Sequence, residues 1–311
     1  VRFHADAPLL LSASEDATLK LWNLSTLPTK RSAARVDLEP VFTYRGHLGP
    51  VLCATVCSHR DVCVSGGADC SVRIWSLPGK HEEPYACAGV SIRHQVQCLV
   101  GHTDAVWAVE IHSLEDWVIS ASADGFVKLW SMDLASPLLR NFVLKSSSGV
   151  VRTPTSVCSV ITDPKRLAVS YTNCGIVLFD VETGKTVNMI PTAPTSDAAV
   201  AEAPDNMASQ PNKIISHPTL PLLISGHEDG SIKLLDVGTG RLVKSLRGHT
   251  DGVTGLALDA SATSLITSGH DSTLRFWDLS TYACINEIPS HRRKLNEGAL
   301  ALAVHPAGDG L

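Results

Sequence analysis

One residue pattern recurs along this chain and constrains its fold more than any other feature. In residues 101–130 a Gly-His pair comes first, a Ser-x-x-x-Asp follows, and a Trp stands six residues after the Asp. The same frame returns at 46–75 and at 248–277, where Thr replaces Ser, and without its Gly-His at 12–22. A motif that recurs at long intervals predicts a repeat architecture in which each repeat is one supersecondary unit.

Each repeat is predicted to form four short strands. Short runs rich in Val, Ile and Leu alternate with turn residues, and in the third repeat they fall at 106–111, 118–122, 126–130 and 141–145. Four antiparallel strands per repeat, arranged radially, make the blade of a β-propeller. The repeats align on six positions, which are Trp22, Trp75, Trp130, Phe179, Leu235 and Trp277.

The predicted fold class is therefore all-β, with residues 1–311 forming one seven-bladed propeller domain. A seventh repeat begins as ALALAVHPAGDG and is incomplete, and Val1 opens in the middle of a strand-like pattern. We therefore expect a fragment of a longer protein, cut at both ends of the ring closure. Segment 191–212 has four prolines, three acids and no aromatic residue, so we expect a disordered loop between blades 4 and 5. Residues 25–40 and 78–98 are expected to be further loop insertions.

The first strand of each repeat is predicted to start with a bulge. Apolar residues lie four, seven and nine positions after the repeat His, for example at Val106, Val109 and Ile111. Strict alternation in a strand would give only even steps, so the step of three indicates one extra residue near the start of the strand.

Composition excludes several classes of protein. A formal charge of -5 gives no broad basic face for nucleic acid, and no apolar run is long enough to span a membrane. The nine cysteines include no Cys-x-x-Cys pair, and their scattered positions fit a reducing cytosol. Four of them fall within 53–70, near His47 and His59. A metal site there is conceivable, but buried structural cysteines are the favoured interpretation. No metal site and no cofactor are predicted.

The repeated His, Ser and Asp residues raise the possibility of a hydrolase. An enzyme needs one activated nucleophile, whereas a repeat needs the same structural contact in every blade. We therefore favour a structural clasp, in which imidazole, hydroxyl, carboxylate and indole N–H satisfy one another. The expected clasps are His47, Ser65, Asp69 and Trp75; His102, Ser120, Asp124 and Trp130; and His249, Thr267, Asp271 and Trp277. No catalytic residue is predicted.

The Gly-His, Ser-x-x-x-Asp and Trp frame resembles the WD40 repeat over the whole chain, and Phe179, Leu235 and the incomplete seventh repeat depart from it. The longer strings VGHTDAVWAVEIH, SHPTLPLLISGHEDGSIKLLD, SASEDATLKLWNL and SHRRKLNEG resemble the C-terminal WD domain of the striatin family. That resemblance implies a non-catalytic scaffold and a regulatory subunit of protein phosphatase 2A, which brings the phosphatase near bound kinases and adaptors. It places the phosphatase, calmodulin and caveolin contacts, and oligomerisation, in segments outside this chain. It also adds peripheral membrane association to the cytoplasmic location.

The resemblance further implies a partner-binding top face. In WD40 propellers this face is lined by the residue five after the repeat His and the residue one before the repeat Asp. Those offsets select Leu52, Trp107 and Thr254, together with Glu15, Ala68, Ala123, Glu228 and His270. Trp107 is the expected anchor, because an aromatic side chain among polar groups suits a protein contact; the alternative is that it packs under a loop.

A second expected contact is the basic run His291, Arg292, Arg293 and Lys294, which could meet an acidic or phosphorylated partner or could simply be solvated. Three functions remain open at this point: a protein-interaction scaffold, which the sequence favours; a reader of a short, modified peptide in the central channel; and an enzyme.

Overall fold

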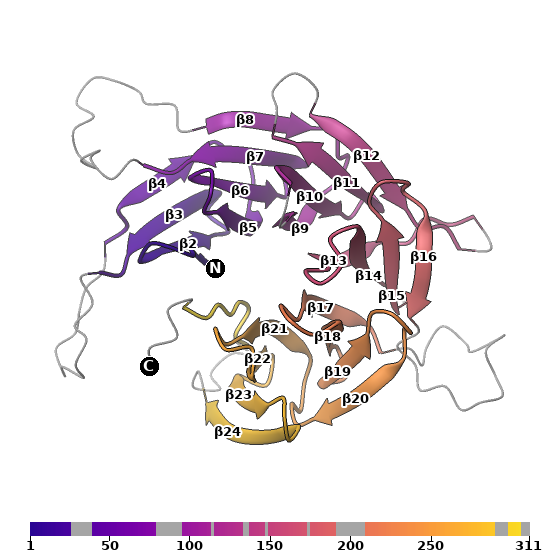
Figure 1. The fold of residues 1–311 in the computed structure, drawn as a ribbon. Helices are drawn as coiled ribbons and strands as arrows, with labels where there is room; N and C mark the ends of the chain where they lie inside the picture. The colour runs from indigo at the N-terminus through magenta and orange to yellow at the C-terminus, as the bar shows by residue number, and fades with distance from the viewer. Residues whose placement is uncertain are drawn as a thin grey trace, which may run out of the picture.

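The computed structural model describes residues 1–25, 39–78, 95–112, 115–132, 137–146, 149–172, 175–190, 209–289 and 298–305. In these residues 24 strands form six four-stranded antiparallel sheets, each built from strands that are consecutive in sequence. Figure 1 shows the sheets arranged like spokes around a central opening, with the first strand of each sheet innermost. The repeat frame thus produces one blade per repeat.

The six blades are defined by the following strands. Blade 1 contains β1 (Arg2–Phe3), β2 (Leu9–Ala13), β3 (Thr18–Asn23) and β4 (Phe42–Arg45). Blade 2 contains β5 (Val51–Cys57), β6 (Val62–Gly67), β7 (Ser71–Ser76) and β8 (Gln95–Val100). Blade 3 contains β9 (Val106–Ile111), β10 (Trp117–Ser122), β11 (Phe126–Ser131) and β12 (Leu138–Val143).

Blade 4 contains β13 (Pro154–Ser159), β14 (Arg166–Tyr171), β15 (Gly175–Asp180) and β16 (Thr186–Ile190). Blade 5 contains β17 (Pro211–Ser216), β18 (Leu222–His227), β19 (Ser231–Asp236) and β20 (Leu242–Arg247). Blade 6 contains β21 (Val253–Leu258), β22 (Ser264–Gly269), β23 (Thr273–Asp278) and β24 (Ala283–Pro289).

Three predicted boundaries need correction. The fourth strand of the third repeat, predicted at 141–145, is β12 and begins at Leu138, because Leu138 still pairs with Trp130 of β11. The insertion predicted at 78–98 ends before Gln95, where β8 begins to pair with β7. Pro211 starts β17 and pairs with His227, so the segment predicted as a loop at 191–212 ends in a strand. Residues 191–208, like most of 25–40, lie outside the described part of the chain.

The predicted bulge at the start of the inner strand is confirmed. In β9 the pairing with β10 jumps from Val106 to Ala108, so Trp107 is the extra residue. In β5 and β21 the same shift leaves out Leu52 and Thr254. Blades 4 and 5 repeat it at Thr155 and Asn212, although neither blade has the Gly-His pair. A bulge re-aims a side chain, and here it falls on the position that the WD40 offsets assign to the top face.

The hydrophobic core lies between neighbouring blades. Five clusters of buried apolar residues join blades 1 and 2, 2 and 3, 3 and 4, 4 and 5, and 5 and 6. In these clusters Trp75, Trp130 and Trp277 each pack against the preceding blade and are at most 3% exposed. Within the described residues no such cluster joins blade 6 to blade 1, and that sector of the ring is open in Figure 1.

The faces of blades 1 and 6 that border the open sector are less buried than the equivalent faces of blades 2 and 4. Trp22, the equivalent of Trp75 in blade 1, is only half-buried. On blade 6, Ile266 and Phe276 are half-buried, whereas the equivalent Ala168 and Leu178 of blade 4 are fully buried. Residues 298–305 run into this sector without forming a strand, and the ring of His305 packs edge-on against Phe3 at 5.2 Å.

Candidate functional site

The repeated polar residues meet as a chain of hydrogen bonds inside blades 2, 3 and 6. In blade 2 the Trp75 Nε1–H donates to Ser65 Oγ at 2.8 Å, and Ser65 Oγ lies 2.7 Å from His47 Nε2. His47 Nδ1 lies 2.9 Å from Asp69 Oδ1. The sets His102, Ser120, Asp124, Trp130 and His249, Thr267, Asp271, Trp277 close in the same way at 2.7–3.1 Å.

The chemistry of these groups fixes the direction of the chain. An ionised Asp69 only accepts, so His47 Nδ1 carries the proton and Nε2 accepts from the Ser65 hydroxyl. Desolvation pushes the pKa of Asp69 upward, but hydrogen bonds from the Leu48 N–H, His47 and Ser71 outweigh it and lower the pKa to about 2. Desolvation lowers the pKa of His47 against the opposing effect of Asp69. The set is therefore a neutral imidazole held by an anionic carboxylate.

This geometry does not suit a hydrolase. Ser65 and Ser120 are 0% exposed, so no substrate can reach either hydroxyl. Each Ser Oγ also accepts an indole N–H, which engages one of its two lone pairs and fixes the hydroxyl inside the blade. The clasp connects the loop before the inner strand, the two middle strands and the turn between them.

A second arrangement resembles a cysteine nucleophile with its base. Cys57 Sγ lies 3.2 Å from His59 Nδ1, and His59 Nε2 lies 2.9 Å from Asp116 Oδ1. The electrostatics argue against a reactive thiolate, because desolvation raises the pKa of the Cys57 thiol and keeps it protonated. Cys57 is also only 2% exposed.

The degenerate blades replace the clasp with other contacts. In blade 5 the imidazole comes from His227, whose Nε2 lies 2.8 Å from Ser225 Oγ and whose Nδ1 lies 3.0 Å from the Ser209 carbonyl. Leu235 fills the Trp position and is buried. In blade 4 Phe179 packs against Phe142 at 5.5 Å between ring centroids. Sequence reasoning missed His227 because it stands two residues after the Ser and not in a Gly-His pair.

The predicted top-face residues lie where the inner strands begin and at the turns between the second and third strands. Trp107 is 48% exposed and Leu52 is 41% exposed, each on the bulge of its inner strand. Glu15, Glu228, His270 and Ala68 are exposed, and Ala123 is half-buried. Leu48 and Val150 are exposed by 89% and 64%, and Leu48 precedes the inner strand of blade 2. Blades 2 to 4 therefore present apolar side chains at this end, whereas blades 1, 5 and 6 present polar ones.

The bulge residues of blades 4, 5 and 6 have a different role. Thr155 Oγ1 donates to the carbonyl of Pro211 at 2.7 Å, and Asn212 Nδ2 donates to that of Val253 at 3.3 Å. Thr254 Oγ1 donates to the carbonyl of Ala299. Pro211 and Val253 are the first residues of β17 and β21, and Ala299 lies in the segment that follows blade 6. Thr254 is half-buried and its hydroxyl joins two neighbouring segments. Thr155 and Asn212 were missed because neither blade has a Gly-His pair from which to count.

Comparison with known proteins agrees with this geometry. The family model described as "WD domain, G-beta repeat" matches residues 1–23, 38–76, 93–131 and 240–278. Striatin-3 of Bos taurus is 36% identical over 306 residues, which are 98% of this chain and 37% of that relative. Striatin and Striatin-4 of Mus musculus are each 37% identical over 306 residues, again 98% of this chain and 38% of each relative. The chain carries a WD40-repeat domain of the striatin family.

The striatin-family domain spans less than two-fifths of the length of these relatives. As a WD40 domain of this family it is a non-catalytic scaffold domain. Among its described residues no helix is long and apolar enough to cross a membrane. The described His, Cys, Asp and Glu side chains form no group of three that could hold a metal ion. The basic run His291, Arg292, Arg293 and Lys294 lies outside the described residues.

Proposed function

We propose that this domain is the protein-recruiting arm of a striatin-type scaffold, which brings kinases and adaptors into a phosphatase–kinase (STRIPAK) complex. The observation that carries the proposal is the exposure of four apolar side chains at the starting ends of the inner strands of blades 2 to 4, which are Leu48, Leu52, Trp107 and Val150. An exposed Trp at the same end of the propeller as exposed aliphatic side chains fits an interface anchor. The polar residues Glu15, Glu228 and His270 complete the face as a rim.

The role of the whole protein follows from the family at a coarser level. We propose a regulatory subunit of protein phosphatase 2A in which calmodulin binding, phosphatase binding and oligomerisation belong to other segments. Its location would be cytoplasmic with peripheral membrane association. Among family members we propose zinedin. This proposal rests on the sequence strings quoted above, because identities of 36–37% do not distinguish Striatin-3, Striatin and Striatin-4 from one another.

We further propose that the complete ring has seven blades. Three observations support this number. Trp22 is half-buried and holds the position in blade 1 at which Trp75 and Trp130 pack against the preceding blade. Phe276 and Ile266 are half-buried on the opposite side of the same open sector. Thr254 bonds to Ala299 as Thr155 bonds to the first residue of β17, which gives Ala299 the place of a first inner-strand residue.

A further contact and an alternative function complete the proposal. The basic run His291, Arg292, Arg293 and Lys294 would contact an acidic or phosphorylated partner. The alternative function, a reader of a short modified peptide, draws support from the place of Trp107 at the starting end of β9. Figure 1 shows β9 as the strand of blade 3 that borders the central opening.

The deciding experiment is affinity capture of the full-length protein from cell lysate, read by mass spectrometry. Trp107→Ala and Leu52→Ala are compared with Leu139→Ala, a control on the outer strand of blade 3 whose exposure of 44% matches that of Trp107. All variants should melt at the wild-type temperature, because the three side chains are exposed. We expect the first two to lose a defined set of kinase-linked or adaptor proteins and the control to retain it. An unchanged set in Trp107→Ala would contradict the top-face proposal, and Trp107-dependent binding of isolated short peptides would favour the peptide reader.

A further inference from the structure

The central channel contains a cavity of about 430 Å³ that the top face does not use. It lies toward the C-terminal ends of the inner strands, where residues 55–59, 109–112 and 213–216 line it. Leu52 and Trp107 stand at the opposite ends of the same strands. Arg2 of blade 1, Glu110 of blade 3 and Lys213 of blade 5 bring three charges to this one cavity.

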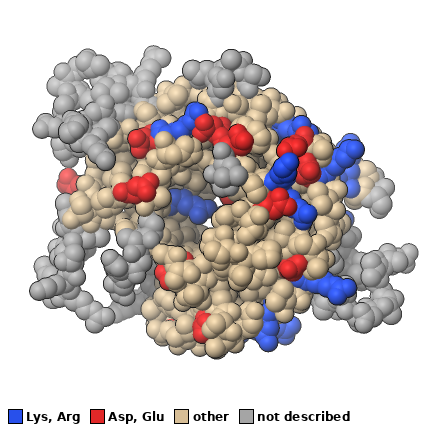
Figure 2. All heavy atoms as spheres, in the orientation of Figure 1, with Lys and Arg blue, Asp and Glu red and all other residues tan. Residues whose placement is uncertain are grey.

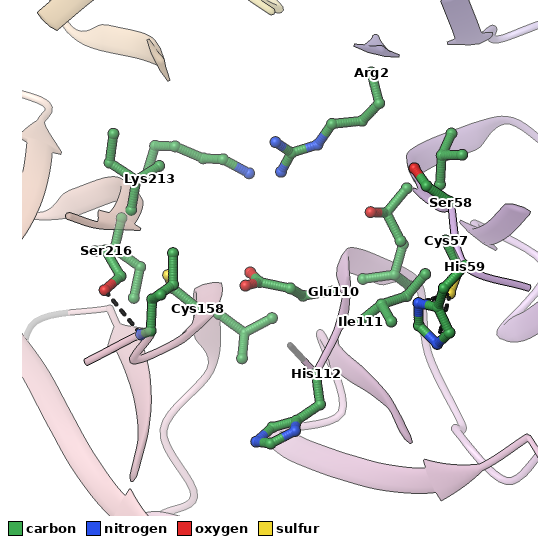
Figure 3. Close-up of a pocket in the computed structure, with 17 residues that line it drawn as sticks. Arg2, Cys57, Ser58, His59, Glu110, Ile111, His112, Cys158, Lys213 and Ser216 are labelled. Atoms are coloured by element: carbon green, nitrogen blue, oxygen red, sulfur yellow. Dashed lines mark hydrogen bonds between the residues drawn. The ribbon is translucent and has the colours of Figure 1, made fainter. Parts of the chain in front are cut away.

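Figure 3 shows that the Arg2 guanidinium and the Lys213 ammonium point toward one another across the cavity. Within the described residues neither cation has a hydrogen bond or an ion pair. Figure 2 shows Lys or Arg atoms at the central opening, while the outer charges are of mixed sign. Two cations that converge repel one another, burial strengthens the repulsion, and the one carboxyl group in the lining, Glu110, cannot balance both charges.

The nearby carboxylate does not neutralise this pair. Glu110 Oε1 accepts hydrogen bonds from the Ser159 N–H at 3.1 Å and the Ser159 hydroxyl at 2.9 Å, so it is turned toward β13. Burial raises the pKa of Glu110, which shifts the carboxyl toward its neutral form. Burial, followed by the charge of Arg2, lowers the pKa of Lys213, the expected response of a cation that has lost water and gained a like charge. The cavity therefore brings two basic side chains together with a single carboxyl group.

We propose that this cavity binds a phosphoryl anion between Arg2 and Lys213. A guanidinium presents a planar fork that matches phosphate oxygens, and an ammonium adds a point charge from the other side. A phosphate carries between one and two negative charges near neutral pH, which complements the excess of basic over acidic side chains in the cavity. The phosphoryl group could belong to a small free metabolite or to a phosphorylated side chain of a partner, and the chemistry of recognition is the same.

The test uses the full-length protein and inorganic phosphate as the probe, with chloride replacing phosphate at constant ionic strength. Binding is measured as a saturable rise in melting temperature and as broadening of the ³¹P resonance. We expect Lys213→Met and Arg2→Gln each to weaken phosphate binding about tenfold or more, as expected for a lost charge-assisted hydrogen bond. Glu110→Gln should strengthen binding, because it removes the one negative charge of the cavity. Lys185→Met, at an exposed lysine of blade 4, is the matched control and should bind like the wild type.

Loss of Lys213 removes a desolvated charge, so the variant should fold, and its melting temperature verifies this. If Lys213→Met nevertheless fails to fold, the other two variants still test the proposal. Arg2→Gln should weaken phosphate binding, and Glu110→Gln should strengthen it. A chloride response equal to that of phosphate, or wild-type binding in folded Lys213→Met, would overturn the proposal.

A phosphoserine tripeptide that binds at least tenfold more tightly than phosphate identifies a partner side chain as the source of the phosphoryl group. Equal or weaker binding identifies a small free anion. Because this cavity and Trp107 lie at opposite ends of the inner strands, failure of one proposal leaves the other intact.

Discussion

The indole N–H of Trp130 donates to Ser120 Oγ at 2.8 Å between two fully buried side chains. The same pair recurs in blade 2 as Trp75 and Ser65 and, without a partner His, in blade 1 as Trp22 and Ser12. In the four blades that have the repeat Trp, its bond to the hydroxyl is therefore the constant part of the clasp, and the His–Asp pair is an addition that fixes the loop before the inner strand. This division of roles predicts how a substitution in the His–Asp pair changes the stability of the domain.

Asp124→Ala should lower the free energy of unfolding by about 1–3 kcal/mol, because it removes the acceptor of His102 Nδ1 and of the Thr103 and Phe126 amides. The measurement is urea denaturation followed by tryptophan fluorescence. The control is Asp6→Ala, at an exposed carboxylate in blade 1, which should change stability by less than about 0.5 kcal/mol. Equal stabilities for the two variants would show that the clasp contributes nothing.

Acidification should destabilise the domain through its buried imidazoles. Burial lowers the pKa of His227 to about 4, from an ordinary value of 6.5, so the unfolded chain takes up a proton that the folded chain refuses. The stabilisation is complete above pH 6.5 and is lost as the pH falls toward 4, by about 3 kcal/mol. His47, His102 and His249, with lowered pKa values, act in the same direction. Urea unfolding between pH 7.5 and 4.5 measures the slope, which His227→Gln should reduce; a stability that rises on acidification would refute this.

Two glycines with positive φ should respond differently to a methyl group. A Cβ on Gly230, where φ is +73°, would lie 2.5 Å from the His249 carbonyl oxygen, whereas Gly149, at +81°, has nothing within 4 Å. Gly149→Ala should cost about 1 kcal/mol, the strain of a left-handed residue. Gly230→Ala adds a backbone clash at the junction of blades 5 and 6 and should cost more than about 3 kcal/mol. Thermal and urea unfolding of the pair test this, and equal losses would contradict the close approach.

Half-buried Cys53 and buried Cys63 should be inert. Burial raises the pKa of both the Cys53 and Cys63 thiols to about 12, so almost no thiolate exists at pH 8. Iodoacetamide should label exposed Cys284 in the folded protein, and Cys53 and Cys63 only after urea is added. Peptide mass spectrometry before and after denaturation measures which cysteines are labelled. Labelling of Cys63 at the rate of Cys284 in the native protein would argue that blade 2 opens readily.

The two proposed partner contacts should differ in their response to salt. Binding through Trp107 is apolar and should change little between 50 and about 500 mM salt, whereas binding through Arg292 and Arg293 should fall steeply as the charges are screened. The double substitution Arg292→Glu/Arg293→Glu should mimic high salt for the same partners. Capture at the two salt concentrations, with wild type and both variants, separates the contacts. Salt-independent capture that is lost in the double variant would refute an electrostatic role.

The clasps and the bulge could be read from the sequence because both are local to one repeat. His, Ser, Asp and Trp stand at fixed spacings within a blade, and a step of three in the apolar pattern marks the bulge at Trp107. The clasp of blade 5 could not be read in the same way. His227 replaces a Gly-His imidazole from another position, and only the fold of β18 shows that its ring reaches Ser225.

The sequence by itself determined the repeat, the all-β blades and the residues that hold each blade together, because those interactions join residues within one period. Only the tertiary structure decided which residues meet across blades. Arg2, Glu110 and Lys213 are far apart in sequence and lie in three different repeats, and none of them belongs to the recurring motif. Their convergence is a consequence of closing strands around a common channel, where the distance between side chains depends on the ring geometry and not on their spacing along the chain.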